Sequence, residues 1–170
     1  MIYPFENKKP IIHASCFIAP SADIVGDVKI GENSSVWFNA TIRADQNPIV
    51  IGKNVSVQDN CVVHVDFESG THIADDVVVG HSAIVHGCKI GSNTIIGMGA
   101  IILSGVEIGR NCIIGAGSVV TEGTKIPDNS IAMGTPAKVV KQVTEEHLKR
   151  IKKNVDVYVE LNKKYKKQLG

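Results

Sequence analysis

Aromatic residues are scarce in this sequence: Phe, Trp and Tyr make up only 5% of it, although 44% of the residues are hydrophobic. A core of that composition must be filled by many small aliphatic side chains rather than by a few bulky rings. Net charge is also low, at +1, so overall charge favours neither a nucleic acid nor an acidic partner. The 170 residues suffice for one ordinary domain with a short appendage.

Long apolar runs and paired cysteines are missing too. No stretch approaches the ~20 apolar residues of a membrane-spanning helix, and the N-terminus lacks the apolar run of a signal peptide. The widely spaced cysteines form no C-x-x-C pair, which excludes a compact disulfide framework and a zinc ribbon. We therefore expect a cytoplasmic protein with no membrane or nucleic-acid partner. Its cysteines are predicted to be reduced and buried: Cys16, Cys61, Cys88 and Cys112.

Aliphatic residues recur at every sixth position over most of the chain, often followed directly by glycine. A period of six fits neither an α-helix nor a half-buried strand. It predicts a three-sided coil in which each hexad forms one short side and one corner, stacked into about six coils. The pattern resembles the hexapeptide-repeat superfamily, whose members form left-handed parallel β-helices, an all-β solenoid fold. The inward positions are Ile18, Ile24, Ile30, Val36, Ile42, Ile51, Val57, Val63, Ile73, Val79, Val85, Ile90, Ile96, Ile102, Ile108, Ile114, Val120 and Ile126.

Two insertions interrupt this rhythm. Three extra residues stand around Asp45 to Pro48, and four extra residues stand around Val65 to His72. Irregular loops on a rigid solenoid often carry function, so both insertions are expected to be loops close to a site.

From Thr144 onward the spacing of apolar residues changes to three, four and seven, which predicts an amphipathic helix. Thr144 is the expected N-cap, and the lysines form the solvated face. The predicted domains are a β-helix over residues 1–143 and a C-terminal helix over residues 144–170 that packs on it. Its apolar face is expected to contain Leu148, Ile151, Val155, Tyr158 and Tyr165.

Counting three hexads per coil brings Arg43, His64 and His86 into one outward column, at the ~4.8 Å spacing of neighbouring strands. Two imidazoles at this spacing can share one metal ion, which needs nitrogen ligands at ~2.0–2.1 Å. His81 falls in a different column, around a corner, and Gln58 stands next to that column. Within one chain His81 would point away from the pair, so the register predicts metal sites completed by a neighbouring subunit of a homotrimer.

Three segments resemble signatures of the γ-class carbonic anhydrases and their homologues. Residues 35–45, SVWFNATIRAD, resemble S-V-W-x-x-A-x-x-R-x-D, and Gln58-Asp59 with His64 resemble the next signature. Gly80-His81 with residues 86–88, HGC, resemble the G-H…H-G-C element. The resemblance covers essentially the whole chain, including the C-terminal helix.

This resemblance implies that the metal ligands are His64, His81 and His86, with His81 reaching across an interface. Three neutral histidines leave the ion its positive charge and an open fourth position. The implied reaction is hydration of carbon dioxide to bicarbonate by a metal-bound hydroxide, since the ion lowers the pKa of water from ~15.7 to ~7, a value established for carbonic anhydrase itself. Zinc suits the three imidazoles, iron or cobalt also fits, and one ion is expected per interface.

The resemblance also implies roles for residues around the metal. Arg43 and Asp45 are similar to a pair that bridges subunits, and Asp59 to a residue that supports the ligands or pairs with an arginine. Gln58 is similar to the residue that hydrogen-bonds and orients the metal-bound water. Tyr158 is similar to a tyrosine of the C-terminal helix near the site, although core packing is an equally good interpretation.

The sequence departs from the family at the groups that export protons. Characterised members carry a glutamate directly after the R-x-D aspartate and another in an acidic loop, whereas this chain has Gln46 at the first position. The acids of its short loop are Asp66 and Glu68. We therefore expect slow or undetectable carbon dioxide hydration unless Glu68 or an external buffer accepts the proton.

Three other functions remain open. Residues 132–138, AMGTPAK, resemble the A-x-G-x-P-A-K coil that also ends many hexapeptide acetyltransferases, so this element does not discriminate. A coenzyme A-dependent acyltransferase needs one catalytic histidine. That function would not explain why His64, His81 and His86 occupy these positions in the repeat. A metal-dependent thioester or ester hydrolase uses the same ligands, and a metal-stabilised structural trimer would need no activity.

Overall fold

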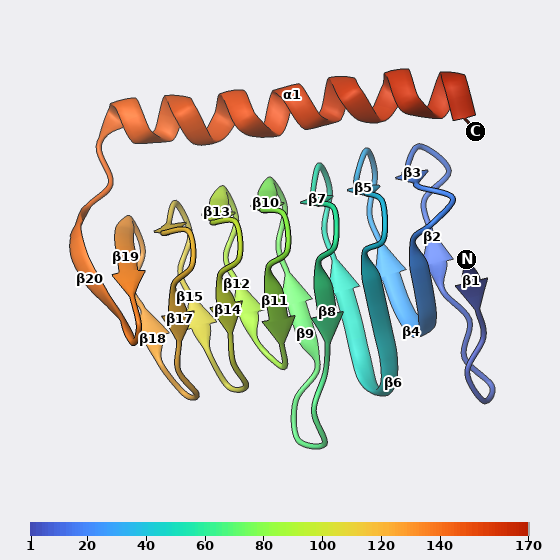
Figure 1. The fold of residues 1–170 in the computed structure, drawn as a ribbon, viewed down its shortest axis with the longest axis horizontal. Helices are drawn as coiled ribbons and strands as arrows, with labels where there is room; N and C mark the ends of the chain where they lie inside the picture. The colour runs from blue at the N-terminus through green and yellow to red at the C-terminus, as the bar shows by residue number, and fades with distance from the viewer. Residues whose placement is uncertain (170) are drawn as a thin grey trace.

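The computed structural model describes residues 1–169 and shows a three-sided β-helix with one long helix along its side (Figure 1). Parallel strand ladders build the three faces, over about seven turns. The left-handed parallel β-helix of hexapeptide repeats with a C-terminal helix, predicted from the period of six, is thus confirmed.

Each face is a ladder of short strands. The helix-covered face contains β3 (Phe17–Ile18), β5 (Ser35–Val36), β7 (Ser56–Val57), β10 (Val77–Val79), β13 (Thr94–Ile96), β16 (Ile113–Ile114), β19 (Ser130–Gly134) and the antiparallel β20 (Ala137–Gln142). The second face contains β1 (Ile2–Tyr3), β8 (Val62–His64), β11 (Ile84–His86), β14 (Ile101–Ile102) and β17 (Val119–Val120). The third face contains β2 (Ile11–Ile12), β9 (Thr71–Ile73), β12 (Lys89–Ile90), β15 (Glu107–Ile108) and β18 (Lys125–Ile126). Two longer strands turn the corner from the second face to the third, β4 (Asp23–Ile30) and β6 (Thr41–Ile51).

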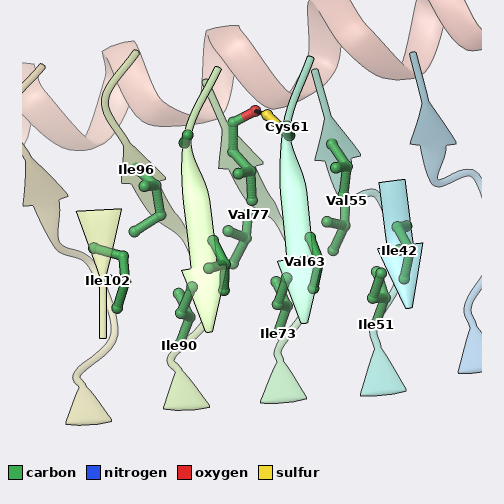
Figure 2. Close-up of a cluster of buried hydrophobic side chains, with 14 of the residues drawn as sticks. Ile42, Ile51, Val55, Cys61, Val63, Ile73, Val77, Ile90, Ile96 and Ile102 are labelled. Atoms are coloured by element: carbon green, nitrogen blue, oxygen red, sulfur yellow. Dashed lines mark hydrogen bonds between the residues drawn. The ribbon is translucent and has the colours of Figure 1, made fainter. Parts of the chain in front are cut away.

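The interior is filled by three columns of aliphatic side chains, one from each face (Figure 2). Val63 pairs with Val85, Ile51 with Ile73, and Val57 with Val79, each one coil apart. All the predicted inward positions are buried except the first, Ile18, which is partly buried at the N-terminal end.

The number of coils is larger than the hexad pattern predicts. Ile12 pairs with Ile30 and Ala132 with Ile114, so both continue the columns beyond the predicted positions. Ala132 lacks the bulk that marks the other positions, and β1 and β2 are joined by an irregular segment that carries no hexad signal. The ends of the solenoid are therefore less visible in the sequence than its middle.

The two insertions behave differently. The expected loop around Asp45 to Pro48 is wrong, because β6 stays extended through these residues and pairs with β4 on both sides of them. A register shift between Gly26 and Val28 absorbs the extra residues, as a bulge does. The second insertion is a loop, as expected, and it extends beyond the neighbouring corners in Figure 1.

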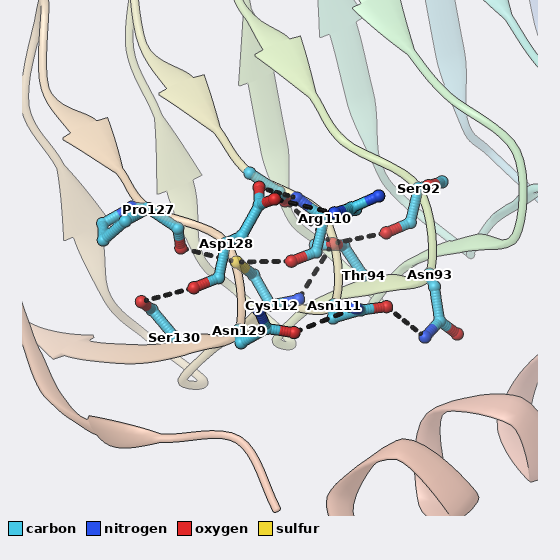
Figure 3. Close-up of polar contacts among 11 residues, drawn as sticks. Ser92, Asn93, Thr94, Arg110, Asn111, Cys112, Pro127, Asp128, Asn129 and Ser130 are labelled. Atoms are coloured by element: carbon cyan, nitrogen blue, oxygen red, sulfur yellow. Dashed lines mark hydrogen bonds and ion pairs between the residues drawn. The ribbon is translucent and has the colours of Figure 1, made fainter.

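One corner of the prism is lined by residues with left-handed backbone conformation. Asn93, Asn111 and Asn129 have φ of 55°, 56° and 59°, which asparagine tolerates better than most residues. Their side chains form a ladder in which each amide donates to the next, at 2.7 Å and then 2.9 Å (Figure 3). Cys112, beside this ladder, donates its thiol to backbone carbonyls (Figure 3).

The cysteine prediction is confirmed for the described residues, since all four are free and buried. Burial raises the pKa of each thiol, to about 11 for Cys61 and about 12 for Cys88. Little thiolate forms at neutral pH, so these groups act as small core side chains.

The C-terminal helix α1 (Glu145–Leu169) lies along the helix-covered face. Thr144 precedes it, and its backbone carbonyl accepts the first helical hydrogen bond from Leu148. Ile151 and Val155 are buried, and Tyr165 packs against the ring of Trp37 at 5.0 Å between centroids. Gly170, the last residue of the predicted domain 144–170, lies outside the described residues, and the division at 143/144 stays a prediction.

Helix α1 carries many lysines on its exposed side. None of the helices in residues 1–169 is both long and apolar enough to cross a membrane.

Substitutions in the core should lower the free energy of unfolding, because each coil packs directly on the next. Ile102 is fully buried. The substitution Ile102→Ala is expected to lower the free energy of unfolding by about 2–5 kcal/mol, because burial is lost and a cavity is left behind. Ile11→Ala, at a position 64% exposed, is the matched control and should change it by less than about 0.5 kcal/mol. Urea unfolding measures both, and equal effects would contradict the assigned register.

Candidate metal centre

Two histidines stand side by side on the second face. His64 ends β8 and His86 ends β11, and the two residues are direct partners in the parallel ladder. Their ring centroids are 5.1 Å apart, and Nδ1 of His64 lies 3.2 Å from Nε2 of His86. The predicted register therefore brings these two side chains together.

Asp45 fixes the ring of His64 through its other nitrogen. Oδ1 of Asp45 lies 3.1 Å from Nε2 of His64, and Arg43 forms an ion pair with the same carboxylate. Burial would raise the pKa of Asp45, but hydrogen bonds, among them the one from His64, and the charge of Arg43 together hold it below its usual value. The carboxylate can only accept, so His64 carries its proton on Nε2 and presents a lone pair at Nδ1.

Ser104 fixes the ring of His86 in the same manner. Its Oγ lies 3.0 Å from Nδ1 of His86. The Ser104 side chain is also the largest cause of the lowered pKa of Asp66, which falls to about 2. If Ser104 accepts from Nδ1–H of His86, a lone pair is left at Nε2 of that ring.

The two facing nitrogens lie 3.2 Å apart, so either one ring donates its N–H to the other or both present lone pairs to a shared cation. Two neutral acceptors at this distance repel each other unless a proton or a cation lies between them. Tetrahedral coordination at ~2.0–2.1 Å places two nitrogen ligands roughly 3.3 Å apart. The pair formed by His64 and His86, each held by an oxygen on its far side, therefore fits one divalent metal ion.

His81 lies on the corner between the helix-covered face and the second face. Its Nδ1 is 2.9 Å from Oδ2 of Asp59, and its side chain is 43% exposed. The predicted arginine partner of Asp59 is absent within residues 1–169 of one chain, where the carboxylate contacts His81 instead. Held at Nδ1, the ring presents Nε2 outward.

Gln58 is buried directly beneath this histidine. Its Oε1 accepts a hydrogen bond from the backbone N–H of His81, at 3.0 Å. Among residues 1–169 of a single chain, no three His, Cys, Asp or Glu side chains form a group that could hold a metal ion. A site with three protein ligands would thus need a donor from outside the chain.

An apolar groove of about 360 Å³ runs from His81 toward the C-terminal coils, between the corner and α1. Tyr158 lines it from the helix and packs edge-on against Trp37, at 5.7 Å between centroids. Burial and the nearby charge of Asp59 raise the pKa of Tyr158, so the phenol keeps its proton at neutral pH. Tyr158, Gln58 and His81 line the same groove, while the contact of Tyr158 with Trp37 also fits the core-packing interpretation.

Glu68 lies on the loop that follows His64 and is exposed. Its backbone N–H donates to Oδ1 of Asp66 at 2.8 Å, and the N–H of Ser69 donates to the same oxygen at 2.7 Å. Its carboxylate makes no hydrogen bond or ion pair with residues 1–169, so the structure does not place it against the histidine pair. The same loop presents Phe67, which sequence reasoning passed over, to solvent.

Sequence reasoning also missed the contacts of Asp45 with His64 and of Ser104 with His86. Asp45 stands two residues after Arg43 on an extended strand, so the alternation of β6 could have placed both on one face. Ser104 carries no signal of this kind, because it lies on the corner that follows β14 and belongs to no motif.

The hydrogen bonds that hold the carboxylate of Asp66, here called the loop clamp, predict that the stability of the protein depends on pH. Because the pKa of Asp66 is held at about 2, below its ordinary 3.8, the clamp stabilises the protein above pH ~4 and loses this effect as pH falls toward ~2. Ser104→Ala is expected to raise the pKa of Asp66 toward its ordinary value. Carboxyl NMR titration measures it, and Ser92→Ala, on another corner, should leave it unchanged. An equally low pKa in Ser104→Ala would contradict the assigned hydrogen bond.

Comparison with known proteins agrees with this architecture. Residues 9–44 and 87–122 match the family Bacterial transferase hexapeptide (six repeats). A carbonic anhydrase of Geobacillus kaustophilus is 49% identical over 98% of this chain and 91% of its own length. A probable carbonic anhydrase of Methanocaldococcus jannaschii is 56% identical over 85% of this chain and 91% of its own length.

A solved structure of a putative acetyltransferase from Bacillus cereus has a TM-score of 0.98 and 48% identity, covering 99% of this chain and 98% of that one. Gamma carbonic anhydrase 2 of Arabidopsis thaliana mitochondria is 39% identical over 91% of this chain, which spans 58% of that protein. Since both the fold and the near-complete alignments agree, the chain belongs to the γ-class carbonic anhydrase-like family of hexapeptide-repeat proteins.

Proposed function

We propose that this protein is a metal-dependent lyase that reversibly hydrates carbon dioxide to bicarbonate at the interfaces of a homotrimer. The observation that carries the proposal is the pair of ring nitrogens on His64 and His86, 3.2 Å apart, with an oxygen contacting the far side of each ring. Zinc, or iron or cobalt in its place, is the proposed ion, one per interface.

A second copy of the chain is the proposed source of the third ligand. His81 projects Nε2 away from its own histidine pair, and closed threefold symmetry would bring it to the pair of the next subunit. The second face also exposes an aliphatic stripe beside the histidines, with Val62 and Ile84 39% and 36% exposed. Such a stripe supports burial against another subunit.

The chain's own residues then have distinct roles. When bound, the ion makes water a nucleophile near neutral pH. Asp45 and the hydroxyl of Ser104 hold the two imidazoles in their acceptor tautomers, and Asp59 does so for His81. Gln58, with its oxygen committed to the backbone N–H of His81, keeps its amide nitrogen as a donor for an oxygen of substrate or product.

Arg43 completes this set by holding the carboxylate of Asp45, and the predicted bridge to a neighbouring subunit would use the same ion pair. Tyr158 remains protonated and can donate its hydroxyl into the groove. Glu68, exposed on the loop after His64, is the proposed relay of protons to solvent. The buried free thiols support a reducing, cytoplasmic location.

The apolar groove beside His81 favours a second candidate. A cavity of about 360 Å³ lined by aliphatic side chains could receive an acyl chain, and a thioester or ester carbonyl could replace carbon dioxide as the electrophile. This alternative uses the same metal site but takes a larger substrate, and it breaks the C–S or C–O bond with release of a thiol or alcohol.

Stopped-flow hydration of carbon dioxide tests the proposal on protein loaded separately with zinc, cobalt or anaerobic ferrous iron. We expect a metal-dependent rate that rises with buffer concentration, because Gln46 replaces the family's glutamate. Glu68→Gln should lower the rate at low buffer concentration, whereas Glu122→Gln, on a distant corner, should not. Fast turnover independent of buffer would contradict the proton-export hypothesis. Inactivity of every fully metallated form would favour the thioesterase or a structural trimer.

Mixed trimers test where His81 binds. His81→Ala and His64→Ala should each abolish metal binding, while His72→Ala, on the third face, should retain it. A 1:1 mixture of the two inactive variants should regain about one quarter of the sites, because each mixed trimer contains one intact pair of neighbours. Metal analysis of the mixture measures the number of restored sites, and light scattering measures its oligomeric state. A mixture without metal, or a monomer with full metal, would overturn the interfacial site.

A further inference from the structure

Phe67 is the most exposed large apolar side chain of the described residues, at 87%. A single exposed apolar residue needs no explanation by itself, but this one is held out by a fixed loop. Asp66 accepts from the N–H groups of Glu68 and Ser69, and Ser69 donates its hydroxyl to the carbonyl of Gly87 at 3.0 Å. Asn47 donates to the carbonyl of Asp66 at 2.6 Å. These hydrogen bonds hold the loop in one conformation. Binding of the Phe67 ring to a partner would therefore cost little further conformational entropy.

An apolar groove lies between α1 and the helix-covered face and reaches the corner that this face shares with the second face. It starts at His81 and Gln58, and Met98, 59% exposed, stands at its rim. Ile95 and Ile113 form part of its wall and are only half-buried. In its own chain Phe67 cannot reach this groove, because His64 ends β8 at one corner whereas His81 lies on the corner where the strands of that face begin.

The threefold arrangement brings the two features together. It places His81 of one subunit against His64 and His86 of the next, and Phe67 follows His64 by three residues. The loop that carries Phe67 then faces the groove that begins at His81 of the neighbour. This step rests on the proposed interface, although it does not require that the interface holds a metal.

We propose that Phe67 of each subunit inserts into the apolar groove beside His81 of the adjacent subunit. The contact is heterologous, with a ring on one surface and a groove on the other, so three copies close the assembly. It removes the phenyl ring and the exposed thioether of Met98 from water. It also fills the space in which an acyl chain would bind, so the substrate of this site is a small molecule rather than a fatty thioester.

Thiol cross-linking of the full-length protein tests this insertion. Phe67→Cys and Met98→Cys are combined in one chain and treated with a short bismaleimide. The native cysteines are buried and have raised pKa values, so they should not react. We expect covalent trimers on a denaturing gel, because each subunit is joined to both neighbours. On the same gel, each single variant should run as a monomer. A mixture of the two single variants should give covalent dimers without trimers, because each mixed trimer contains one contact between the two introduced thiols.

Two controls make the result specific. Phe67→Cys combined with Ile11→Cys, an exposed residue of the third face, should give no covalent species. A trimer by light scattering in which the Phe67→Cys/Met98→Cys pair fails to cross-link would overturn the insertion. Metal content, measured on the same samples, separates the two proposals: cross-linked trimers without metal would support the insertion and contradict the metal site.

Discussion

The stacking register of the coils is the constraint on which the rest of this structure depends. Parallel ladders fix equivalent residues of neighbouring coils ~4.8 Å apart, and the small aliphatic columns leave no room for a shift. The direct pairing of His64 with His86 follows from that ladder. A slip by one residue would turn both imidazoles into the core and bring Val63 and Val85 to the surface. The stability of the prism and the geometry of its histidine pair thus have one cause.

The same register explains why the three candidate histidines do not meet within a single chain. Side chains on different faces of a triangular prism diverge, so His81 points away from His64 and His86. Within the chain, polar contacts hold the separate histidines: Asp45 and Ser104 contact the two rings of the pair, while Asp59 holds His81. In the proposed trimer, assembly would join histidines that are already oriented, which would limit the rotamer entropy lost on binding a metal.

Substrate size connects the assembly with the chemistry. The groove beside His81 is large enough for an acyl chain when one chain is considered alone. The loop after His64 offers Phe67 as a filling group from a second copy, and Asp66 of the same loop accepts the N–H groups of Glu68 and Ser69. Closing the groove would leave room for carbon dioxide and bicarbonate and exclude larger carbonyl compounds. A loop of a few residues would therefore affect assembly, ligand orientation and selectivity.

The sequence by itself determined the three-sided fold, the inward columns, the C-terminal helix and the pairing of two histidines, because a strict period of six converts residue number directly into position. It could not show that the residues around Asp45 remain in β6, since pairing with β4 overrides the irregular spacing. Nor could it show that Asp45 and Ser104 hold the imidazoles, or that Phe67 is exposed beside them. These contacts join residues from different coils through side-chain directions at corners, where the repeat is broken. Only the tertiary structure decides where such side chains point.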